Sequence, residues 1–314
     1  MELLRGLHPS HHPEQPTVVT IGNFDGVHRG HQQLIHRLQR LARPQGCATA
    51  VVLFEPQPQE YFRPEQAPPR LFSLRDKVMA LRDLGVDWIW VLRFDQRIAN
   101  EAATDFVRQR LVGVLRAKHV MVGDDFRFGA ARQGDLGLLQ QMGAELGFQA
   151  EGMGSFCVES TRVSSTAVRN LLAASDFKGA AALLGRPYRL AGRVIYGQQL
   201  GRTLGFPTAN IAIGPHRRAV DGVYRVWARC GDDPIPQPAM AIVGVKPSFA
   251  HLGPMLEVHL LQGSPNLYGQ VLSVEWIEKV REAKKYDSLV ALQAAIQNDI
   301  ANARAAFART ENGS

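Results

Sequence analysis

The sequence predicts two domains: an α/β domain built on a parallel sheet, then a small antiparallel β-barrel with a C-terminal helix. Up to residue 185, strand-like segments alternate with helical segments of about 10–15 residues, a pattern typical of crossover units. After residue 185, short strand-like segments are separated by Gly and Pro turns, which is typical of small barrels. A chain of 314 residues is long enough for two cores. We therefore expect domains 1–185 and 186–314.

The elements of the first domain follow from its periodicity. Residues 17–22 are apolar and β-branched up to Gly22, whereas residues 30–42 repeat apolar side chains with a helical period. Ser73 suits a helix N-cap and Gly85 a helix stop. The other expected strands are 47–54, 86–94 and 118–123, and the expected helices are 30–42, 73–85, 99–115, 136–147, 165–175 and 176–185. The Pro-rich segment before residue 17 is expected to be a disordered end.

The second domain is predicted to be mostly strands. Arg186-Pro187 is interpreted as a linker, and no internal repeat joins the two halves. The expected strands are 188–197, 208–213, 222–230, 238–246, 256–262 and 269–277, followed by a helix over 288–307.

A buried parallel sheet binds its ligands beyond the carboxyl ends of its strands, so the loops after the first domain's strands are the segments in which to seek a site.

Composition excludes several classes of protein. Charged residues make up 21% of the chain, no run approaches the ~18 apolar residues of a membrane helix, and the start lacks the apolar core of a signal peptide, so we expect a soluble cytoplasmic protein. The three cysteines show no metal-ligand or disulfide spacing. The net charge is +7, but Lys and Arg alternate with acids, so anionic small substrates explain it and no nucleic acid or membrane partner is expected. A homo-oligomer stays open.

The segment GNFDGVHRGH (22–31) follows the first strand and begins a helix. Its glycines allow close approach of the backbone to a ligand, and a helix start offers N–H groups to phosphates. His28 and His31 are three residues apart, so both imidazoles can donate to one phosphate chain. The alternative, two unrelated surface histidines, is disfavoured because the motif lies on a strand-to-helix turn.

Two further segments lie where the same sheet would bind ligands. VGDDFRFG (122–129) follows the fourth strand, although a polar turn explains it equally well. VSSTAVR (163–169) begins a helix, where capping is the commoner role of Ser and Thr. Arg169, one turn into that helix, can still pair bidentately with a phosphate.

Together with F-x-P-x-P (54–58), these motifs resemble, in order, the Rossmann-like nucleotidyltransferase domain of bacterial bifunctional riboflavin kinase/FMN adenylyltransferases over about 17–185. The resemblance implies that ATP is bound by Gly22, Asn23, Asp25, His28, Gly30 and His31, with both histidines on its phosphates. It also implies that Arg162, Ser164, Thr166 and Arg169 close on the triphosphate and that Asp125 lies near the flavin substrate. The implied chemistry is attack of the FMN phosphate on the α-phosphorus of ATP, with Mg²⁺ accompanying the departing pyrophosphate.

The second domain contains a Gly-rich loop that leads to Pro207-Thr208-Ala209-Asn210. In an extended segment Thr208 and Asn210 share one face, where a hydroxyl and an amide oxygen can ligate Mg²⁺. Gly201 and Gly205 can cradle phosphate with backbone N–H groups. By itself the loop fits a Gly-rich barrel corner better, and it is not a Walker A loop.

The strand LEVHLLQ (256–262) alternates, with Glu257 and His259 on one face. A carboxylate at a strand centre is often only solvated. This strand, however, resembles the strand that carries the catalytic Glu of riboflavin kinases, and PTAN (207–210), DGVYRV (221–226) and 267–289 resemble other riboflavin kinase segments, over about 186–303. The resemblance implies that Glu257 is the general base toward the riboflavin hydroxyl, that Gly201, Gly205, Thr208 and Asn210 hold Mg²⁺-ATP, and that Arg281 lies near the flavin.

Two departures from this family pattern affect the expectation. The chain has Gln262-Gly263 where the family often has Asp-Phe, and Lys246-Pro247-Ser248 where it has Arg-Pro-Thr. They motivate an alternative in which the adenylyltransferase is active and the kinase barrel is weak or inactive. A second alternative is a non-catalytic flavin- or nucleotide-binding regulator, which the intact HxGH, PTAN and Glu257 argue against. The expected substrates and products are riboflavin, FMN, FAD and ATP.

Overall fold

The computed structural model describes residues 1–7, 9–197, 201, 205–213, 218–231, 233, 235–245, 254–263 and 265–311. Contacts within the chain divide it into two compact units, the first made of Met1–Pro68 with Leu74–Ser165 and the second of Pro69–Ser73 with Thr166–Ser314. The second unit thus contains two helices that the sequence assigned to the first domain. The boundary at residue 185 stays a prediction about which parts fold independently.

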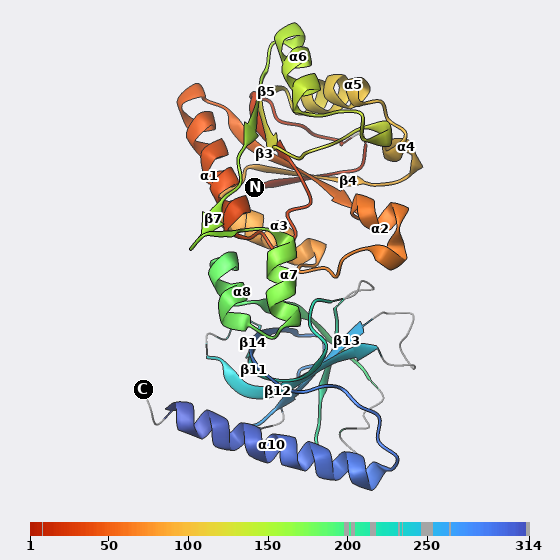
Figure 1. The fold of residues 1–314 in the computed structure, drawn as a ribbon, viewed down its shortest axis with the longest axis vertical. Helices are drawn as coiled ribbons and strands as arrows, with labels where there is room; N and C mark the ends of the chain where they lie inside the picture. Colours follow the sequence, from red (N-terminus) through yellow and green to blue (C-terminus); the bar gives the residue numbers. More distant parts are fainter. Residues whose placement is uncertain are drawn as a thin grey trace. The chain divides into compact units, whose positions relative to one another are not determined.

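The first unit holds an all-parallel six-stranded sheet (Figure 1). Its strands are β1 (Glu2–Arg5), β2 (Thr17–Ile21), β3 (Ala48–Glu55), β4 (Trp88–Arg93), β5 (Ala117–Gly123) and β6 (Gln149–Met153). Its longer helices are α1 (Arg29–Ala42), α3 (Leu74–Asp83) and α6 (Leu136–Leu146). The shorter elements are η1 (Arg43–Gln45), α2 (Pro58–Phe62), η2 (Pro64–Gln66), α4 (Gln96–Ala99), α5 (Ala103–Asp105), η3 (Phe106–Val114), η4 (Ala130–Arg132) and a hairpin of β7 (Cys157–Val158) and β8 (Thr161–Arg162).

The strand order β1-β4-β3-β2-β5-β6 places the switch point of the sheet between β2 and β5. From β2 the chain moves to β3 on one side, and it later returns to β5 on the other side. Loops that leave neighbouring parallel strands in opposite directions open a crevice at the carboxyl edge, which is where such sheets bind ligands. The GNFDGVHRGH turn and the VGDDFRFG loop follow these two strands.

Both faces of this sheet are covered, which explains why its four inner strands, β2 to β5, are mostly apolar and buried. One face packs against η3 and α6, with Phe106, Leu111 and Leu139 in a shared core with strand residues. Helix α1 contacts β2 and β3 and buries Leu34, Ile35 and Leu38. In Figure 1, α1 and α6 lie on opposite sides of the sheet.

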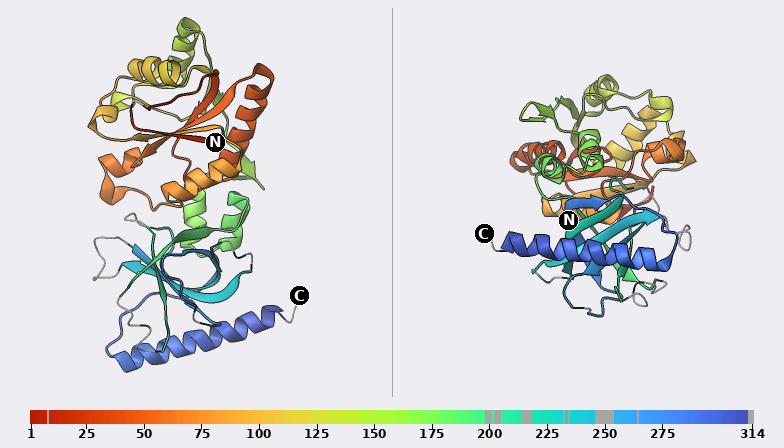
Figure 2. Two further views of the ribbon diagram at one scale, coloured as in Figure 1. Left: turned by 180° about the vertical axis from the view of Figure 1, so that it is seen from behind. Right: turned by 60° about the horizontal axis from the view of Figure 1, so that its bottom comes forward.

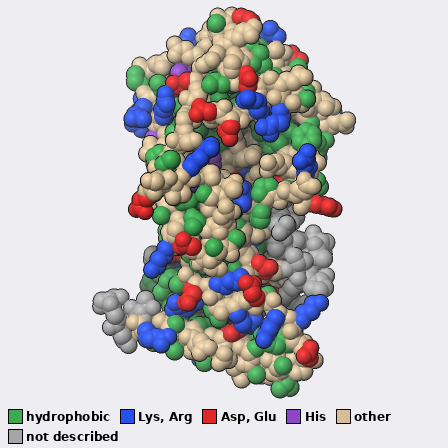
Figure 3. Space-filling view, viewed as in Figure 1, with side chains coloured by type: hydrophobic (Ala, Val, Ile, Leu, Met, Phe, Trp, Pro, Cys, Tyr) green, Lys and Arg blue, Asp and Glu red, His purple; other side chains and the backbone are tan. Residues whose placement is uncertain are grey.

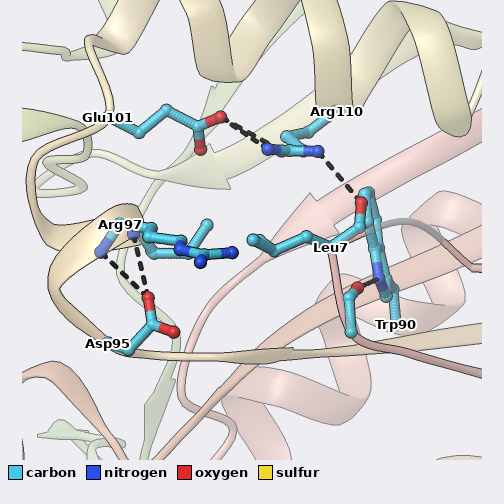
Figure 4. A network of polar contacts seen from close by, with 8 residues as sticks. Leu7, Trp90, Asp95, Arg97, Glu101 and Arg110 are labelled. Atoms are coloured by element: carbon cyan, nitrogen blue, oxygen red, sulfur yellow. Dashed lines mark hydrogen bonds and ion pairs between the residues drawn. The ribbon is translucent and has the colours of Figure 1, made fainter.

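The expectation of a disordered N-terminal end was wrong for β1. Residues Glu2–Arg5 pair in parallel with β4 at the edge of the sheet, and Leu4 is fully buried. The chain after β1 is held by two side-chain donors, the Trp90 indole to the Gly6 carbonyl at 2.8 Å and Arg110 Nη1 to the Leu7 carbonyl at 3.0 Å (Figure 4). The sequence signal was weak because the strand has four residues and none is β-branched.

The expected single helix over 99–115 was also wrong. The chain forms α4, a break and then α5, which continues as the π-helical η3. The break brings Glu101 to Arg110, whose Nε and Nη2 lie 3.1 and 2.9 Å from one Glu101 oxygen, both side chains being nearly buried (Figure 4). π-Helical turns are rare, and they are frequently found at functional sites.

The second unit is a closed six-stranded antiparallel barrel with helices, as the sequence predicts. Its strands, in the barrel order β10-β13-β12-β11-β14-β9, are β10 (Ala209–Ala212), β13 (Pro254–Leu260), β12 (Gln237–Val245), β11 (Gly222–Cys230), β14 (Val271–Arg281) and β9 (Arg189–Ile195). Its helices are α7 (Ser165–Ala173, whose first residue belongs to the first unit), α8 (Phe177–Leu184) and α10 (Leu289–Glu311). Figure 2 shows α10 lying along the barrel, where Ile300, Ala303 and Phe307 pack against strand residues.

Residues 186–188, which include the Arg186-Pro187 segment interpreted as a linker, are packed within the second unit. Arg186 lies over the Phe72 ring at 5.0 Å, and burial, reinforced by nearby Arg189, lowers its pKa. Tyr188 is buried and donates to the Leu71 carbonyl at 3.1 Å. The segment therefore has a structural role.

A fragment comparison tests the place of α7 and α8. Phe177 of α8 is 6% exposed, 5.9 Å from the Tyr224 ring and 6.3 Å from the Trp276 ring. We expect fragment 166–314 to be more stable than fragment 186–314 by about 3–5 kcal/mol, the usual cost of removing a large buried aromatic side chain. Urea unfolding followed by tryptophan fluorescence measures the difference. Equal midpoints would show that α7 and α8 add nothing to the barrel.

Candidate active sites

The turn between β2 and α1 has an unusual backbone. Phe24 and Val27 have φ values of 48° and 39°, and Gly26 has 80°. A positive φ is uncommon for Phe and an outlier for a β-branched Val, and such strain clusters at functional sites. The buried side chains of Phe24 and Val27 hold the turn in this conformation. The result is a tight loop that directs the start of α1 toward the carboxyl edge of the sheet.

His28 and His31 lie together at the start of α1. Their rings stack with centroids 3.7 Å apart and planes 15° from parallel. His28 is the helix N-cap, and its Nδ1 accepts from the His31 backbone N–H at 3.4 Å, which leaves the proton of the neutral ring on Nε2. A Cβ on Gly30 would lie 3.2 Å from His28 Nδ1, so a larger residue would press on the ring. The two imidazoles thus lie together with the N–H groups of the helix start.

The other residues predicted for ATP divide between the two units. In the first unit, Asp25 is buried, Asn23 is exposed, and the Ser165 hydroxyl donates to the Asp25 carbonyl at 2.9 Å, tying the start of α7 to the turn. Arg162 lies at the end of the short β7–β8 hairpin, with Ser164 two residues later. Thr166 and Arg169 belong to the second unit, where Arg169 Nε donates to the Pro69 carbonyl at 2.7 Å.

The loop after β5 presents Asp125 at the carboxyl edge. Asp125 is exposed, and a Cβ on Gly123 would lie 3.3 Å from its Oδ1. Beyond it, Phe128 is buried against Phe106 at 5.7 Å. A Cβ on Gly129 would meet Ala103 at 2.7 Å, so this position requires glycine. The loop is therefore built on the segment that Glu101 and Arg110 hold in place.

Sequence reasoning missed a cluster of three aromatic side chains at the same edge. Tyr61, Phe62 and Phe94 lie 5.3–5.6 Å apart as edge-to-face pairs, and Phe62 is 61% exposed. They follow β3 and β4 in the chain. An exposed aromatic side chain at the ligand-binding edge of a sheet is a suitable surface for a flat conjugated ring. The available signal was the pair Tyr61-Phe62, three residues after the end of F-x-P-x-P.

In the barrel, β10 and β13 bring the PTAN segment to the Glu257 strand. Asn210 lies directly opposite Glu257, and Ala209 lies opposite Val258. Opposite residues of an antiparallel pair share a face with Cβ atoms about 4.5–5.5 Å apart. The face bearing Val258 lines the interior, so Glu257 and Asn210 lie on the outer face. Continuing the register by one residue sets Thr208 opposite His259. We call Thr208, Asn210, Glu257 and His259 the outer-face patch.

Two glycines of the Gly-rich segment, Gly197 and Gly201, lie close to the outer-face patch. A Cβ on Gly197 would collide with the Asn210 amide, and a Cβ on Gly201 would lie 3.2 Å from Thr208 Oγ1. Asn210 is 6% exposed, and within the described residues its Oδ1 has no hydrogen-bond partner. A buried amide oxygen without a donor, next to a hydroxyl, is the donor set that Mg²⁺ prefers. The residues therefore fit the metal. Gly205 has φ 86°, and Arg202–Leu204 lie outside the described residues.

His259 of β13 reaches the segment that leads into β10. Its Nδ1 is 2.9 Å from the Pro207 carbonyl oxygen, and its ring meets Phe206 edge-on at 6.1 Å. Burial lowers the pKa of His259, and nearby Arg304 adds to this, whereas the hydrogen bond to Pro207 opposes it.

Arg281 forms an ion pair with Asp299 of α10, donating from Nε and Nη2 to one carboxylate oxygen at 2.9 and 2.7 Å. Its guanidinium thus joins β14 to α10, and its predicted place near the flavin stays a prediction.

Of the two departures from the family pattern, Gln262-Gly263 is exposed just after β13. Lys246–Ser248 lie outside the described residues.

A parallel sheet with two imidazoles at a helix start at its switch point, together with a barrel that sets a carboxylate opposite an amide, has the arrangement of a two-site enzyme of phosphate transfer. Family models agree: "FAD synthetase" matches residues 10–167 and "Riboflavin kinase" matches residues 184–307. The chain belongs to the bifunctional riboflavin kinase/FMN adenylyltransferase family, which confirms the resemblance inferred from its motifs.

Relatives cover the whole chain. The bifunctional riboflavin kinase/FMN adenylyltransferase of Escherichia coli (strain K12) is 45% identical over 99% of both chains, and that of Pseudomonas fluorescens is 46% identical over 97% of both. A crystal structure described as a macrolide-efflux protein from Streptococcus pneumoniae is similar with a TM-score of 0.72 and 26% identity, covering 93% of this chain and 95% of that one. Among the described residues, no helix of this chain is long and apolar enough to span a bilayer.

Proposed function

We propose that the barrel phosphorylates riboflavin with ATP to give FMN, and that the first unit adenylylates FMN with a second ATP to give FAD and pyrophosphate. The observation that carries this proposal is the presence of both sites in one chain: a stacked histidine pair at a helix start, and Glu257 opposite Asn210. A protein that only binds flavin needs no carboxylate placed beside a metal site.

In the kinase step, Glu257 accepts the proton of the riboflavin 5′-hydroxyl as its oxygen bonds to the γ-phosphorus of ATP. The bond from that phosphorus to the β-phosphate bridging oxygen breaks, and ADP leaves. Thr208 Oγ1 and Asn210 Oδ1 would hold Mg²⁺, which neutralises charge on the phosphates. Gly201 and Gly205 would offer their backbone N–H groups to the phosphate chain. The base chiefly orients the hydroxyl and removes its proton as the bond forms.

In the adenylylation step, a phosphate oxygen of FMN attacks the α-phosphorus of ATP and pyrophosphate leaves. The attacking oxygen is already an anion, so no protein base is required. His28 Nε2–H and the imidazole of His31 donate to the charge that develops on the phosphates, and the start of α1 adds its N–H groups. Gly22, Asn23, Asp25 and Gly30 shape the ATP turn. Arg162 and Ser164, from the same unit, would add contacts to the triphosphate.

FMN binds beside the loop after β5 in this proposal. Asp125 lies near its polar groups, and the exposed Phe62 offers a face for the isoalloxazine ring, since aromatic contact favours a flat conjugated system. On the face that Figure 3 displays, Lys and Arg side chains stand among Asp and Glu side chains and form no continuous basic patch. A cytoplasmic location without nucleic acid or membrane partners stays a prediction from composition, and the oligomeric state stays open.

Product analysis tests both halves. With riboflavin, ATP and Mg²⁺, the protein is expected to form FMN, FAD, ADP and pyrophosphate; with FMN in place of riboflavin, it is expected to form FAD and pyrophosphate but no ADP. Chelation of the metal is expected to stop both reactions. Chromatography of flavins and nucleotides measures each product. FAD from FMN without any FMN from riboflavin would show that only the adenylyltransferase is active.

A further inference from the structure

His259 occupies the corner of the outer-face patch that the proposed kinase chemistry does not use. Glu257 has the role of base, and Thr208 and Asn210 provide metal ligands. The alternation along β13 places His259 on the same face as Glu257, and the register sets it opposite Thr208. A histidine here does more than fill space, because one ring nitrogen makes a short contact across the strands.

The partner of that nitrogen determines its protonation. The Pro207 carbonyl oxygen, 2.9 Å from Nδ1, can only accept a hydrogen bond. Nδ1 must therefore carry a proton, and the neutral ring is the Nδ1–H tautomer. Burial favours the neutral ring by lowering the pKa of His259. His259 thus donates one directed hydrogen bond to the backbone of the PTAN segment.

That hydrogen bond acts on the peptide group that joins Pro207 to Thr208. The carbonyl and the Thr208 nitrogen share one rigid plane, so fixing the oxygen restricts the rotation of the plane. The Thr208 side chain is carried by the next Cα, and its Oγ1 is the proposed metal ligand. Residues that orient a metal ligand without touching the metal typically contribute about 10–100-fold to metal affinity or activity.

The His259 ring is itself supported by neighbours in the barrel unit. Arg304 of α10 donates to the Leu261 carbonyl at 3.0 Å, which anchors the end of β13 two residues beyond His259. Phe206 meets the ring edge-on and packs against the cluster formed by Ile300, Ala303 and Phe307. Helix α10 thereby holds both strand and loop in the position where the hydrogen bond forms.

We propose that His259 is a positioning residue of the kinase site, holding Thr208 for magnesium-bound nucleotide by donating its Nδ1–H to the Pro207 carbonyl. This inference rests on the proposed kinase function. In this role His259 need not touch either substrate. Binding of magnesium-bound nucleotide is expected to depend on the hydrogen-bond donor at Nδ1 and not on the rest of the ring.

Two variants of the full chain separate the donor from the ring. His259→Asn keeps an N–H donor at the position of Nδ1, whereas His259→Phe keeps an aromatic ring and removes the donor. Calorimetry of ADP binding with and without Mg²⁺ gives a readout without turnover. We expect His259→Phe to weaken magnesium-dependent ADP binding about 10–100-fold and to raise the kinase KM for ATP, while adenylylation of FMN and the thermal midpoint change little. We expect His259→Asn to stay within about threefold of wild type, well short of that range.

Nitrogen NMR of ¹⁵N-histidine-labelled wild type supplies a test that needs no active variant. The His259 signals, assigned by their loss in His259→Asn, are expected to show the Nδ1–H tautomer. The inference is overturned by the Nε2–H tautomer, by His259→Phe binding Mg²⁺-ADP like wild type, or by equal losses in both variants. If the wild-type protein makes no FMN from riboflavin, the kinase proposal itself fails. That result is distinguishable from a failure of the His259 inference because it is seen before any substitution is made.

Discussion

Glu257→Gln is expected to lower FMN production about 10²–10⁴-fold, the usual contribution of a general base. Glutamine keeps the size and hydrogen-bonding capacity of the side chain but cannot accept the hydroxyl proton. Riboflavin binding is therefore expected to persist, and the loss is expected in kcat. Steady-state phosphorylation of riboflavin measures it, with flavin fluorescence quenching to confirm binding.

Glu278→Gln is the matched control, because it makes the same change on β14, a strand of the barrel that does not pair with β13. Glu278 is itself largely exposed, with its Oε2 2.8 Å from Nη2 of the partly buried Arg225, and the change is expected to leave the kinase rate unchanged. Adenylylation of supplied FMN by Glu257→Gln serves as a second control for folding. If Glu257→Gln phosphorylates riboflavin within about threefold of wild type, below the general-base range, Glu257 is a solvated strand residue and the base lies elsewhere.

His28→Ala and His31→Ala are each expected to abolish most FAD formation while FMN formation survives. Removing one preorganised donor to a developing negative charge typically costs about 10²–10³ in kcat, and here each substitution also ends the stacking of the two rings. The kinase site lies in the other unit, so its rate is expected to be unchanged. FAD formation from FMN and FMN formation from riboflavin are measured on the same preparations.

His28 is also a helix N-cap, so a further variant separates the two roles. His28→Asn retains a side-chain acceptor for the His31 N–H, whereas His28→Ala loses it at a cost of about 1 kcal/mol in stability. Both are expected to lose FAD formation if the imidazole acts on phosphate. His36→Ala, an exposed histidine on the same helix, is the neutral control. A folded His28→Ala that also loses kinase activity would contradict the assignment of separate sites.

The structure confirmed most of the expected helices and strands whose hydrophobic pattern was continuous along the segment. Helix 30–42 is observed as α1 (Arg29–Ala42), and strand 118–123 as β5 (Ala117–Gly123). The expected helix over 99–115 was wrong because periodicity does not register the ion pair of Glu101 with Arg110, which depends on a break in the helix and on the carbonyl of a distant segment.

Within the candidate sites, the motifs named the residue types but not their partners. Arg281 was predicted near the flavin, yet the structure pairs it with Asp299, a residue for which the sequence offered no signal beyond its place in a helix. Phe62 was missed because an exposed aromatic side chain is recognised only once its surroundings are known. The roles assigned to Glu257, His28 and His31 stay predictions that the variants above can decide.

The sequence by itself determined the two fold classes, the family and the motifs, because hydrophobic period, turn residues and motif spacing are properties of short stretches of chain. Only the tertiary structure decided that Asn210 lies opposite Glu257 and that His259 reaches the Pro207 carbonyl. Both depend on the register between strands far apart in sequence, and a slip of one residue would turn every side chain of β13 to the other face. Local patterns leave that register open, and the packing of the whole barrel selects it.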